Sequence, residues 1–343
     1  YAIAFADESE VVGGYENGEI RRWKVEGGQQ QGPTIKAGSD IYSLVVSRNG
    51  QWIVSGDRAK KVTVWNADTH EKVREFTEHL GPVWGVDISR DCTTIASVDR
   101  NAARLFSIAS GAQFLPPLQH HHAVRVKFSP DGSRLATASF DSGFCIYDTR
   151  GGTLLFSSGT MSSVDAALAT PLAWSSDGQQ LFVANIRRIT CFNLSNSSSS
   201  EWQIHKTQSR TSVSIASNGS FIACSKGSSV SLWDCVSHEQ IGSIISHTAD
   251  ICSITLSPKG RYLACGFNGG KVTIHNLGDI LSPEQLDHIV SVQPLMQFVL
   301  LTLLTQGDQM DTKTCSGCIV GITYIALRFV GGPCFSASAC TNQ

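Results

Sequence analysis

One short pattern recurs along this chain and constrains its fold more than any other feature. An alternating run of apolar and polar residues ends in a ring side chain, usually followed by Asp, Asn or Ser; VTVWN at residues 62–66 is one example. The ring positions are Trp23, Trp65, Phe106, Tyr147, Phe192, Trp233 and His275. By subtraction the steps between them are 42, 41, 41, 45, 41 and 42 residues. A period of about 40–45 residues built from short strands is typical of propeller blades.

The stretch from residue 123 to 157 shows how one repeat is built. AVRVKF (123–128) predicts a first strand, and SPDG (129–132) predicts a turn in which Pro fixes φ and Gly permits a positive φ. SRLATAS (133–139), FCIYD (144–148) and GTLLFSS (152–158) supply three further strands. The repeat is therefore expected to be a four-stranded antiparallel meander.

Seven such units fit the chain, with first strands beginning near residues 1, 41, 82, 123, 171, 212 and 251. The expected fold is all-β, a seven-bladed propeller whose ring protects most strand edges. The seventh unit shows only three strands in the sequence. We therefore expect its blade to lack a regular fourth strand or to borrow one.

The repeats resemble the WD-repeat family over roughly residues 1–276. The resemblance implies that a His, a Ser, an Asp and a Trp in each repeat form a buried hydrogen-bonded set that locks the blade. No repeat carries the complete set: Phe106 and Tyr147 replace Trp in the third and fourth repeats, and His275 does so in the seventh. The matching positions are Ser55, Asp57, Trp65, His79, Ser97, Asp99, Ser139, Asp141, Trp233 and His247.

Composition excludes several classes of function. The formal net charge is −2, which leaves no electrostatic footprint for nucleic acid, and 41% of the residues are hydrophobic against 16% charged. The 11 cysteines are scattered and no signal peptide is evident, so a disulfide framework is not expected. These features favour a cytoplasmic or nuclear protein.

The sequence predicts no enzyme, no cofactor and no metal site. It lacks G-x-x-x-x-G-K-[ST], G-x-S-x-G and H-E-x-x-H. The run His120-His121-His122 has no ligand-spaced partner nearby and reads as a solvated loop between blades. Cys315-x₂-Cys318, followed by Cys334 and Cys340, resembles a zinc pattern more closely, but its last spacing departs from the zinc-ribbon form.

The family resemblance implies a protein-binding scaffold whose top rim contacts other proteins or peptides. Aromatic residues concentrated on such a rim would be plausible anchors, with an Arg as a polar contact. The candidate partner-binding positions on the rim are Tyr15, Tyr42, Trp84, Arg125, Phe140 and Phe267.

A second reading concerns the run Tyr147-Asp148-Thr149-Arg150. It resembles the aromatic-Asp-x-Arg box by which some WD-repeat proteins dock as substrate receptors on cullin-RING ubiquitin ligases. Arg150 would then supply an exposed charged contact. The alternative function is therefore a ligase substrate receptor.

The repeat pattern ends near residue 277, so we expect a propeller at 1–277 and a short helical linker at 278–290. Ser282 and Pro283 suit the N-cap and first position of that helix. Residues 291–343 are apolar, and their runs are too short or interrupted to span a bilayer. They could be a partner-binding helix, a membrane-associated segment or, as we favour, a stretch foreign to the propeller design. The repeats resemble those of WD-repeat proteins that are abundant in fungi, and we expect this chain to be one module of a larger protein.

Overall fold

The computed structural model describes residues 2–139, 143–159, 171–184, 188–204, 213–217 and 219–285, with the backbone alone for 213–217. The chain divides into two compact units, Tyr1–Pro294 and Leu295–Gln343. All the elements below belong to the first unit. The expected tail at 291–343 lies outside the described residues, and the domain boundaries given above stay predictions.

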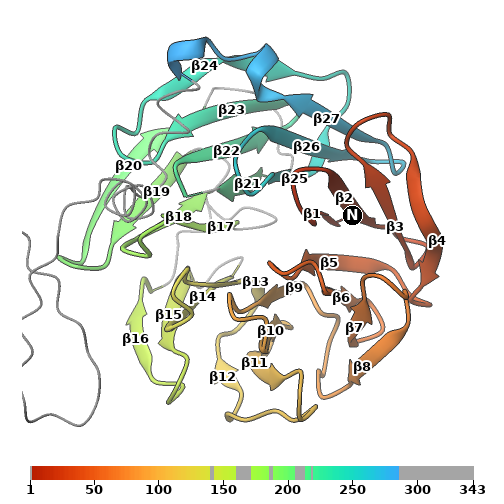
Figure 1. The fold of residues 1–343 in the computed structure, drawn as a ribbon. Helices are drawn as coiled ribbons and strands as arrows, with labels where there is room; N and C mark the ends of the chain where they lie inside the picture. The colour runs from red at the N-terminus through yellow and green to blue at the C-terminus, as the bar shows by residue number, and fades with distance from the viewer. Residues whose placement is uncertain are drawn as a thin grey trace, which may run out of the picture. The chain divides into compact units, whose positions relative to one another are not determined.

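The strands form seven separate antiparallel sheets, the blades of one propeller (Figure 1). The first three blades contain β1 (Ala2–Phe5), β2 (Glu10–Gly14), β3 (Glu19–Lys24), β4 (Gln30–Lys36), β5 (Ile41–Val46), β6 (Trp52–Asp57), β7 (Val62–Asn66), β8 (Lys72–Phe76), β9 (Gly85–Ile88), β10 (Thr94–Val98), β11 (Ala102–Ser107) and β12 (Leu118–Gln119). Blades four and five contain β13 (Ala123–Phe128), β14 (Arg134–Ser139), β15 (Phe144–Asp148), β16 (Leu154–Ser157), β17 (Leu172–Trp174), β18 (Gln180–Ala184), β19 (Arg188–Asn193) and β20 (Ser198–Gln203). The last two contain β21 (Val213–Ser217), β22 (Phe221–Lys226), β23 (Ser229–Asp234), β24 (Gln240–Ser246), β25 (Ile251–Leu256), β26 (Tyr262–Phe267) and β27 (Val272–Asn276).

Each blade is a simple meander, which confirms the predicted all-β fold and strand order. The first strand of every blade lies innermost, and neighbouring inner strands pack from β1 through β5, β9, β13, β17 and β21 to β25. The contact between β25 and β1 closes the ring. Across this closure the Glu8 carboxylate accepts hydrogen bonds from the Ser257 hydroxyl at 2.9 Å and the Lys259 backbone N–H at 2.5 Å.

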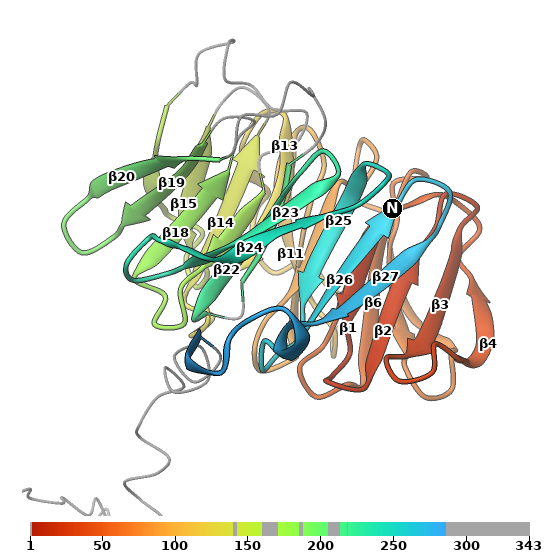
Figure 2. The ribbon, with the colours of Figure 1, turned by 90° about the horizontal axis from the view of Figure 1, so that it is seen from above.

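The meander gives the ring two distinct faces, which the strands connect in Figure 2. On the face that we call the top lie the turns between second and third strands and the links between blades. On the opposite, bottom face lie the turns between first and second strands, where Gly50 and Gly132 have φ of 71° and 74°. In these bottom turns the Ser47 and Ser129 hydroxyls accept the backbone N–H groups of Trp52 and Arg134. The turn chemistry read from the sequence therefore fixes the register of successive strands.

The core consists of apolar clusters between neighbouring blades. Between blades two and three, Phe76 and Phe106 stack with ring centroids 4.4 Å apart, and both side chains are almost fully buried. Val54, Val64 and Ile95 fill the same cluster. The aromatic residue near the end of the third strand therefore contributes to packing between blades, in addition to any hydrogen bond that it makes.

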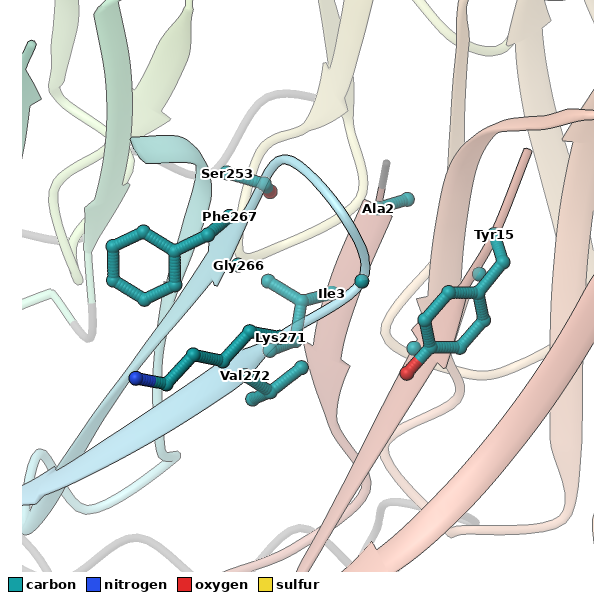
Figure 3. Close-up of a pocket in the computed structure, with 11 residues that line it drawn as sticks. Ala2, Ile3, Tyr15, Ser253, Gly266, Phe267, Lys271 and Val272 are labelled. Carbon is teal, nitrogen blue, oxygen red and sulfur yellow. The ribbon is translucent and has the colours of Figure 1, made fainter. Parts of the chain in front are cut away.

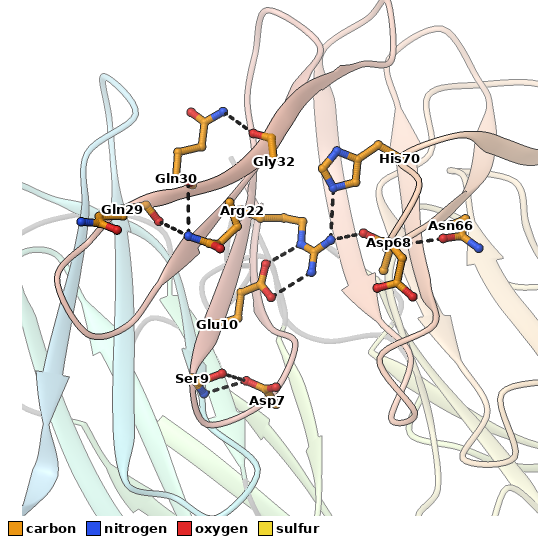
Figure 4. Close-up of polar contacts among 12 residues, drawn as sticks. Asp7, Ser9, Glu10, Arg22, Gln29, Gln30, Gly32, Asn66, Asp68 and His70 are labelled. Carbon is orange, nitrogen blue, oxygen red and sulfur yellow. Dashed lines mark hydrogen bonds and ion pairs between the residues drawn. The ribbon is translucent and has the colours of Figure 1, made fainter.

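A polar clamp joins blades one and two near the outside of the ring (Figure 4). Arg22 on β3 binds the Glu10 carboxylate through Nε and Nη2, the latter at 2.9 Å. Its Nη1 also donates to the Ala67 carbonyl and lies 3.1 Å from His70 Nε2, both in the next blade. The Arg22 and Glu10 side chains are only 16% and 15% exposed, so this contact is partly shielded from water.

Within the described residues the seventh blade has three strands, β25, β26 and β27, as the sequence indicated. A 3-10 turn, η1 (Leu277–Asp279), follows β27. Residues 283–285 are helical, and the Ser282 hydroxyl accepts the Gln285 N–H at 3.3 Å while the Gln285 side chain accepts the Ser282 N–H at 3.0 Å. This capping box starts the helix where the sequence placed it; residues 286–290 lie outside the described part of the chain.

Candidate functional site

The third blade carries the most complete locking set. His79, in the link that enters the blade, has Nε2 2.7 Å from the Ser97 hydroxyl and Nδ1 3.3 Å from the Asp99 carboxylate. Asp99 also accepts N–H groups from Leu80 at 2.9 Å and Asn101 at 2.8 Å. Burial alone would raise the pKa of Asp99, but His79 and the backbone donors outweigh it and hold that pKa well below its ordinary range. The set is buried and joins the entering link to the second strand and to the turn after it, so it holds the blade together.

The second blade is locked by fewer polar side chains than the third. The Trp65 indole N–H donates to the Ser55 hydroxyl at 2.9 Å, and both side chains are buried. Asp57 accepts the Lys61 backbone N–H at 2.9 Å. No His is present in the link that enters this blade, and burial raises the pKa of Asp57 despite its hydrogen bonds. The motif VTVWN at residues 62–66 therefore supplies Trp65, the aromatic partner of Ser55 in the lock of this blade.

In the fourth and sixth blades other residue pairs make the locking hydrogen bond. His120 is buried and its Nδ1 lies 2.6 Å from the Thr137 hydroxyl, so it is not part of a solvated loop. Thr137 pairs with Cys145 as Ser55 pairs with Thr63, which places Thr137 rather than Ser139 at the locking position of the ladder. Asp141 lies outside the described residues. In blade six the Trp233 indole donates to the Ser231 hydroxyl at 2.8 Å.

In the seventh blade the locking positions hold three different groups. One nitrogen each of His247 and His275 and the sulfur of Cys265 all lie within 4.8 Å of one another. Phe267 stands where Asp99 stands in blade three, with its ring centroid 4.9 Å from that of His247. Burial lowers the pKa of both histidines and raises the pKa of the Cys265 thiol to about 12.

On the top face, blades two, three and four together form what we call the top-face cluster: Tyr42, Trp84, Arg100 and Arg125. Tyr42 and Trp84 stack with ring centroids 4.8 Å apart and an interplanar angle of 24°. The Arg100 guanidinium lies 5.2 Å from the Trp84 ring centroid, a cation–π distance. Arg125 donates from Nη1 to the Trp84 carbonyl at 3.1 Å. The cluster offers half-buried rings flanked by two cationic side chains.

Local backbone structure explains why Tyr42 reaches this surface. In β5, Ile41 pairs with Asp57 and Ser43 with Gly56, so Tyr42 is the extra residue of a β-bulge. A bulge of the same kind in β13 inserts Val124 just before Arg125. Bulges redirect a side chain away from the regular alternation. The top ends of the inner strands therefore present side chains that a regular ladder would direct elsewhere.

The other two described rim positions lie apart from the top-face cluster. Tyr15 and Phe267 line a small hollow between blades one and seven, together with Lys271 (Figure 3). Its volume is ≈ 10 Å³, about enough for one water molecule. Tyr15 packs edge-on against Trp23 at 5.9 Å, and burial raises the pKa of its phenol to about 12. These two rings therefore serve packing at the ring closure, and Phe140 lies outside the described residues.

A larger groove of ≈ 500 Å³ lies on the bottom face between blades three and four. Its lining includes Arg90, the exposed ring of Phe114 and the exposed Arg150. Asp148 accepts the backbone N–H groups of Arg150 at 3.1 Å and Gly151 at 2.6 Å. Asp148 thus shapes the turn, while Arg150 faces the groove.

Arg100 is the member of the cluster that the sequence did not reveal. It lies in the polar turn between β10 and β11, where a charged residue gives no signal by itself. Its place above Trp84 follows only from the fold. The locks of blades two, three and four are separate sets of side chains, each bonded within its own blade or its entering link. No helix of the described part of the chain is long and apolar enough to cross a membrane.

Comparison with known proteins agrees with this architecture. The family model "WD domain, G-beta repeat" matches residues 30–66, 113–148, 196–234 and 238–276. Serine-threonine kinase receptor-associated protein of Mus musculus is 26% identical over 298 residues, 83% of this chain and 81% of that protein. Apoptotic protease-activating factor 1 of Homo sapiens is 31% identical over 196 residues, 52% of this chain but only 15% of that protein.

A third relative is eukaryotic translation initiation factor 3 subunit I of Aspergillus terreus, 32% identical over 108 residues, 30% of this chain and 32% of that protein. Each of the four family matches ends within or next to a third strand, at the position of the recurring ring and its polar neighbour. The matches thus follow the same period that the sequence shows. The chain therefore contains WD repeats, and these lie in a seven-bladed β-propeller.

Proposed function

We propose that the chain is a non-enzymatic protein-interaction module whose contact surface is the top-face cluster. The observation that carries the proposal is the stacked Tyr42–Trp84 pair flanked by Arg100 and Arg125. Tyr, Trp and Arg are the residue types that dominate binding energy at protein interfaces, because they combine large apolar area with a polar end. Tyr42 and Arg125 lie on the inner strands β5 and β13, and Trp84 directly precedes β9, so these side chains need little ordering on binding.

The chemistry of the cluster suggests the kind of partner. The exposed guanidinium of Arg100 beside half-buried rings suits a protein segment that carries a carboxylate next to an apolar or aromatic residue. The net charge of −2 gives no support for nucleic acid as the partner. The printed names of two relatives, one receptor-associated and one a subunit, fit an assembly role. We place this role in the cytoplasm or nucleus.

The test is affinity capture from a native extract with three forms of the whole chain: wild type, Arg100→Glu, and the double variant Tyr42→Ala, Trp84→Ala. Arg100 is exposed, so its charge reversal leaves the fold intact. The control is Arg90→Glu, an exposed residue of the bottom groove. Proteins lost with both cluster variants but kept by the control support the proposal. An unchanged captured set from both cluster variants, with folding verified by circular dichroism, refutes it.

The alternative is a substrate receptor of a cullin-RING ubiquitin ligase that docks through Arg150. One observation favours keeping it in the test: Arg150 is exposed beside Phe114 in the bottom groove, on the opposite face from the top-face cluster. Because the two surfaces are separate, Arg150→Ala tests it independently. Loss of ligase subunits from the captured set with Arg150→Ala alone supports docking there, and their absence from the wild-type set excludes it.

A further inference from the structure

The seventh blade keeps the geometry of the blade lock but replaces its chemistry. In the β26–β27 ladder Cys265 pairs with Thr273, as Ser55 pairs with Thr63 in blade two. His275 pairs with Leu263, as Trp65 pairs with Ile53. His247 enters from the preceding link, as His79 does in blade three. A thiol and a second imidazole therefore occupy the positions of a hydroxyl and an indole or phenyl ring.

This replacement leaves polar atoms without partners. Nε2 of His247 and Nε2 of His275 are buried, and neither has a hydrogen-bond partner among the residues described. Cys265, between them, is fully buried. In blade three the corresponding histidine lies 2.7 Å from the Ser97 hydroxyl and 3.3 Å from the Asp99 carboxylate, whereas Phe267 takes the place of that carboxylate beside His247. Buried nitrogens without a hydrogen-bond partner are costly, and here they belong to two imidazoles that each have a nitrogen within 4.8 Å of the same thiol sulfur.

The three ligand atoms lie close enough together for one small metal ion to bind all of them after a small rearrangement. They lie within 4.8 Å of one another. A tetrahedral site with Zn–N of about 2.1 Å and Zn–S of about 2.3 Å has ligand-to-ligand edges of about 3.4–3.8 Å. Rotations of the two imidazoles and the thiol, with about 1 Å of closure, bring the set to that size.

We propose that His247, Cys265 and His275 form a Zn²⁺ site inside the seventh blade, with the fourth position taken by water. Two imidazoles and one thiolate are ligands that Zn²⁺ prefers over Mg²⁺ or Ca²⁺. Binding replaces the thiol proton of Cys265, which passes to solvent, so each ion bound releases one proton. Both histidines are half-buried, which gives the ion a route from the surface.

The proposed metal site would stabilise the seventh blade, which has fewer described strands than the other blades. It ties together the link after β24, strand β26 and strand β27, which forms the outer edge of the seventh blade among the described residues. The other six blades have four strands each. A metal crosslink therefore stabilises the blade that closes the ring, independently of what the top face binds.

The experiment measures metal binding to the whole chain. Chelator-treated wild-type protein is titrated with Zn²⁺ and with Co²⁺, and the visible absorption of a Co²⁺–thiolate bond is recorded. We expect a site with thiolate absorption that Cys265→Ser abolishes and that His247→Ala weakens roughly 100-fold. Cys265→Ser is a conservative change because the other blades show a hydroxyl at that position, so the variant is expected to fold.

Two controls separate this site from other cysteines. Cys252→Ser, in β25 of the same blade but outside the trio, should bind Co²⁺ like the wild type. The double variant Cys315→Ser, Cys318→Ser should also leave the thiolate absorption in place. Absence of thiolate absorption in the wild type, or its loss with the Cys315/Cys318 variant instead of Cys265→Ser, refutes the proposal.

A second measurement does not depend on spectra. Zn²⁺ at about 100 times its dissociation constant should raise the melting temperature of the wild type by roughly 5–10 °C, because it binds only the folded protein. Cys265→Ser should show no such rise. Equal shifts in the two proteins would mean that the ion binds elsewhere and would also refute the proposal.

Discussion

Blades three and seven place their locking residues in the same geometry and satisfy them differently. In blade three the imidazole of His79 lies between a hydroxyl and a carboxylate, both within hydrogen-bond or ion-pair distance. In blade seven the imidazole of His247 faces a thiol and another imidazole, and Phe267 replaces the carboxylate. The first set has a carboxylate at ion-pair distance from its imidazole, whereas the second offers a thiol and another imidazole and leaves two buried nitrogens without hydrogen-bond partners. Backbone register thus fixes where a lock lies, and side-chain chemistry decides whether it closes by itself.

The largest effect should come from breaking the complete lock. Asp99→Ala leaves His79 and several backbone N–H groups without their acceptor in a fully buried site. We expect the free energy of unfolding to fall by about 3–5 kcal/mol, as for other buried charge partners. Urea unfolding measures it. His247→Ala in chelated protein is the matched comparison and should cost only about 1 kcal/mol, since no hydrogen bond is lost. Equal losses in the two blades would contradict the distinction drawn between them.

Acid titration should separate the aspartates of blades two and three. The pKa of Asp99 is lowered in the folded protein, so its stabilising contribution is complete above the ordinary pKa of about 3.9 and is lost as the pH falls toward the folded value. The pKa of Asp57 is raised by burial, so its ionisation costs stability as the pH rises through the interval from the ordinary to the raised value.

The two variants Asp99→Asn and Asp57→Asn should therefore change the pH profile of the unfolding midpoint in opposite directions. Asp99→Asn should flatten the loss of stability in acid, and Asp57→Asn should steepen it relative to the wild type. The control is Asp68→Asn, an exposed carboxyl in the turn after β7. If both variants change the pH profile in the same direction, the opposite pKa shifts of Asp99 and Asp57 are contradicted, and with them the role of His79 in lowering the pKa of Asp99.

A smaller effect is expected from the two-residue lock of blade two. Trp65→Phe removes the indole N–H that donates to the Ser55 hydroxyl, while the ring packing is largely kept. We expect a loss of about 1–2 kcal/mol in the free energy of unfolding. Trp52→Phe, a half-buried ring at the start of β6, is the control and should cost less. Blade three tolerates Phe106 because His79 bonds Ser97, which blade two cannot reproduce.

The periodicity and turn chemistry of the sequence predicted much of this molecule. Inner strands were expected near residues 41, 123 and 251, and β5, β13 and β25 begin at those residues. The reason is physical: alternation, Gly turns and a ring at a constant step are local features, and the register follows from them. Arg150 was expected to be exposed on the surface, and it is.

What the sequence could not give is proximity between blades and across ladders. Arg100 gave no signal because its contact with Trp84 depends on how two loops meet. Thr137 takes the locking position in blade four because the ladder register, not the distance to the next Asp, decides which side chain faces His120. The trio in blade seven is separated by 18 and 10 residues, a spacing that matches no familiar zinc motif. Only pairing of the strands brings those atoms together.

The smallest predicted effect tests whether chemistry alone separates the blades. The double variant Cys265→Ser, His275→Trp gives blade seven the hydroxyl and indole that blade two carries in the same ladder positions. In chelated protein an indole-to-hydroxyl hydrogen bond would then form where two buried nitrogens lacked partners, so the free energy of unfolding should rise by about 1 kcal/mol. The same variant should no longer gain stability from Zn²⁺, because a thiolate and an imidazole are gone. His275→Trp alone is the control, since it adds the larger ring without the hydroxyl. If the double variant is no more stable than this control, the ladder position does not suffice to build the lock, and the difference between the blades lies in their packing.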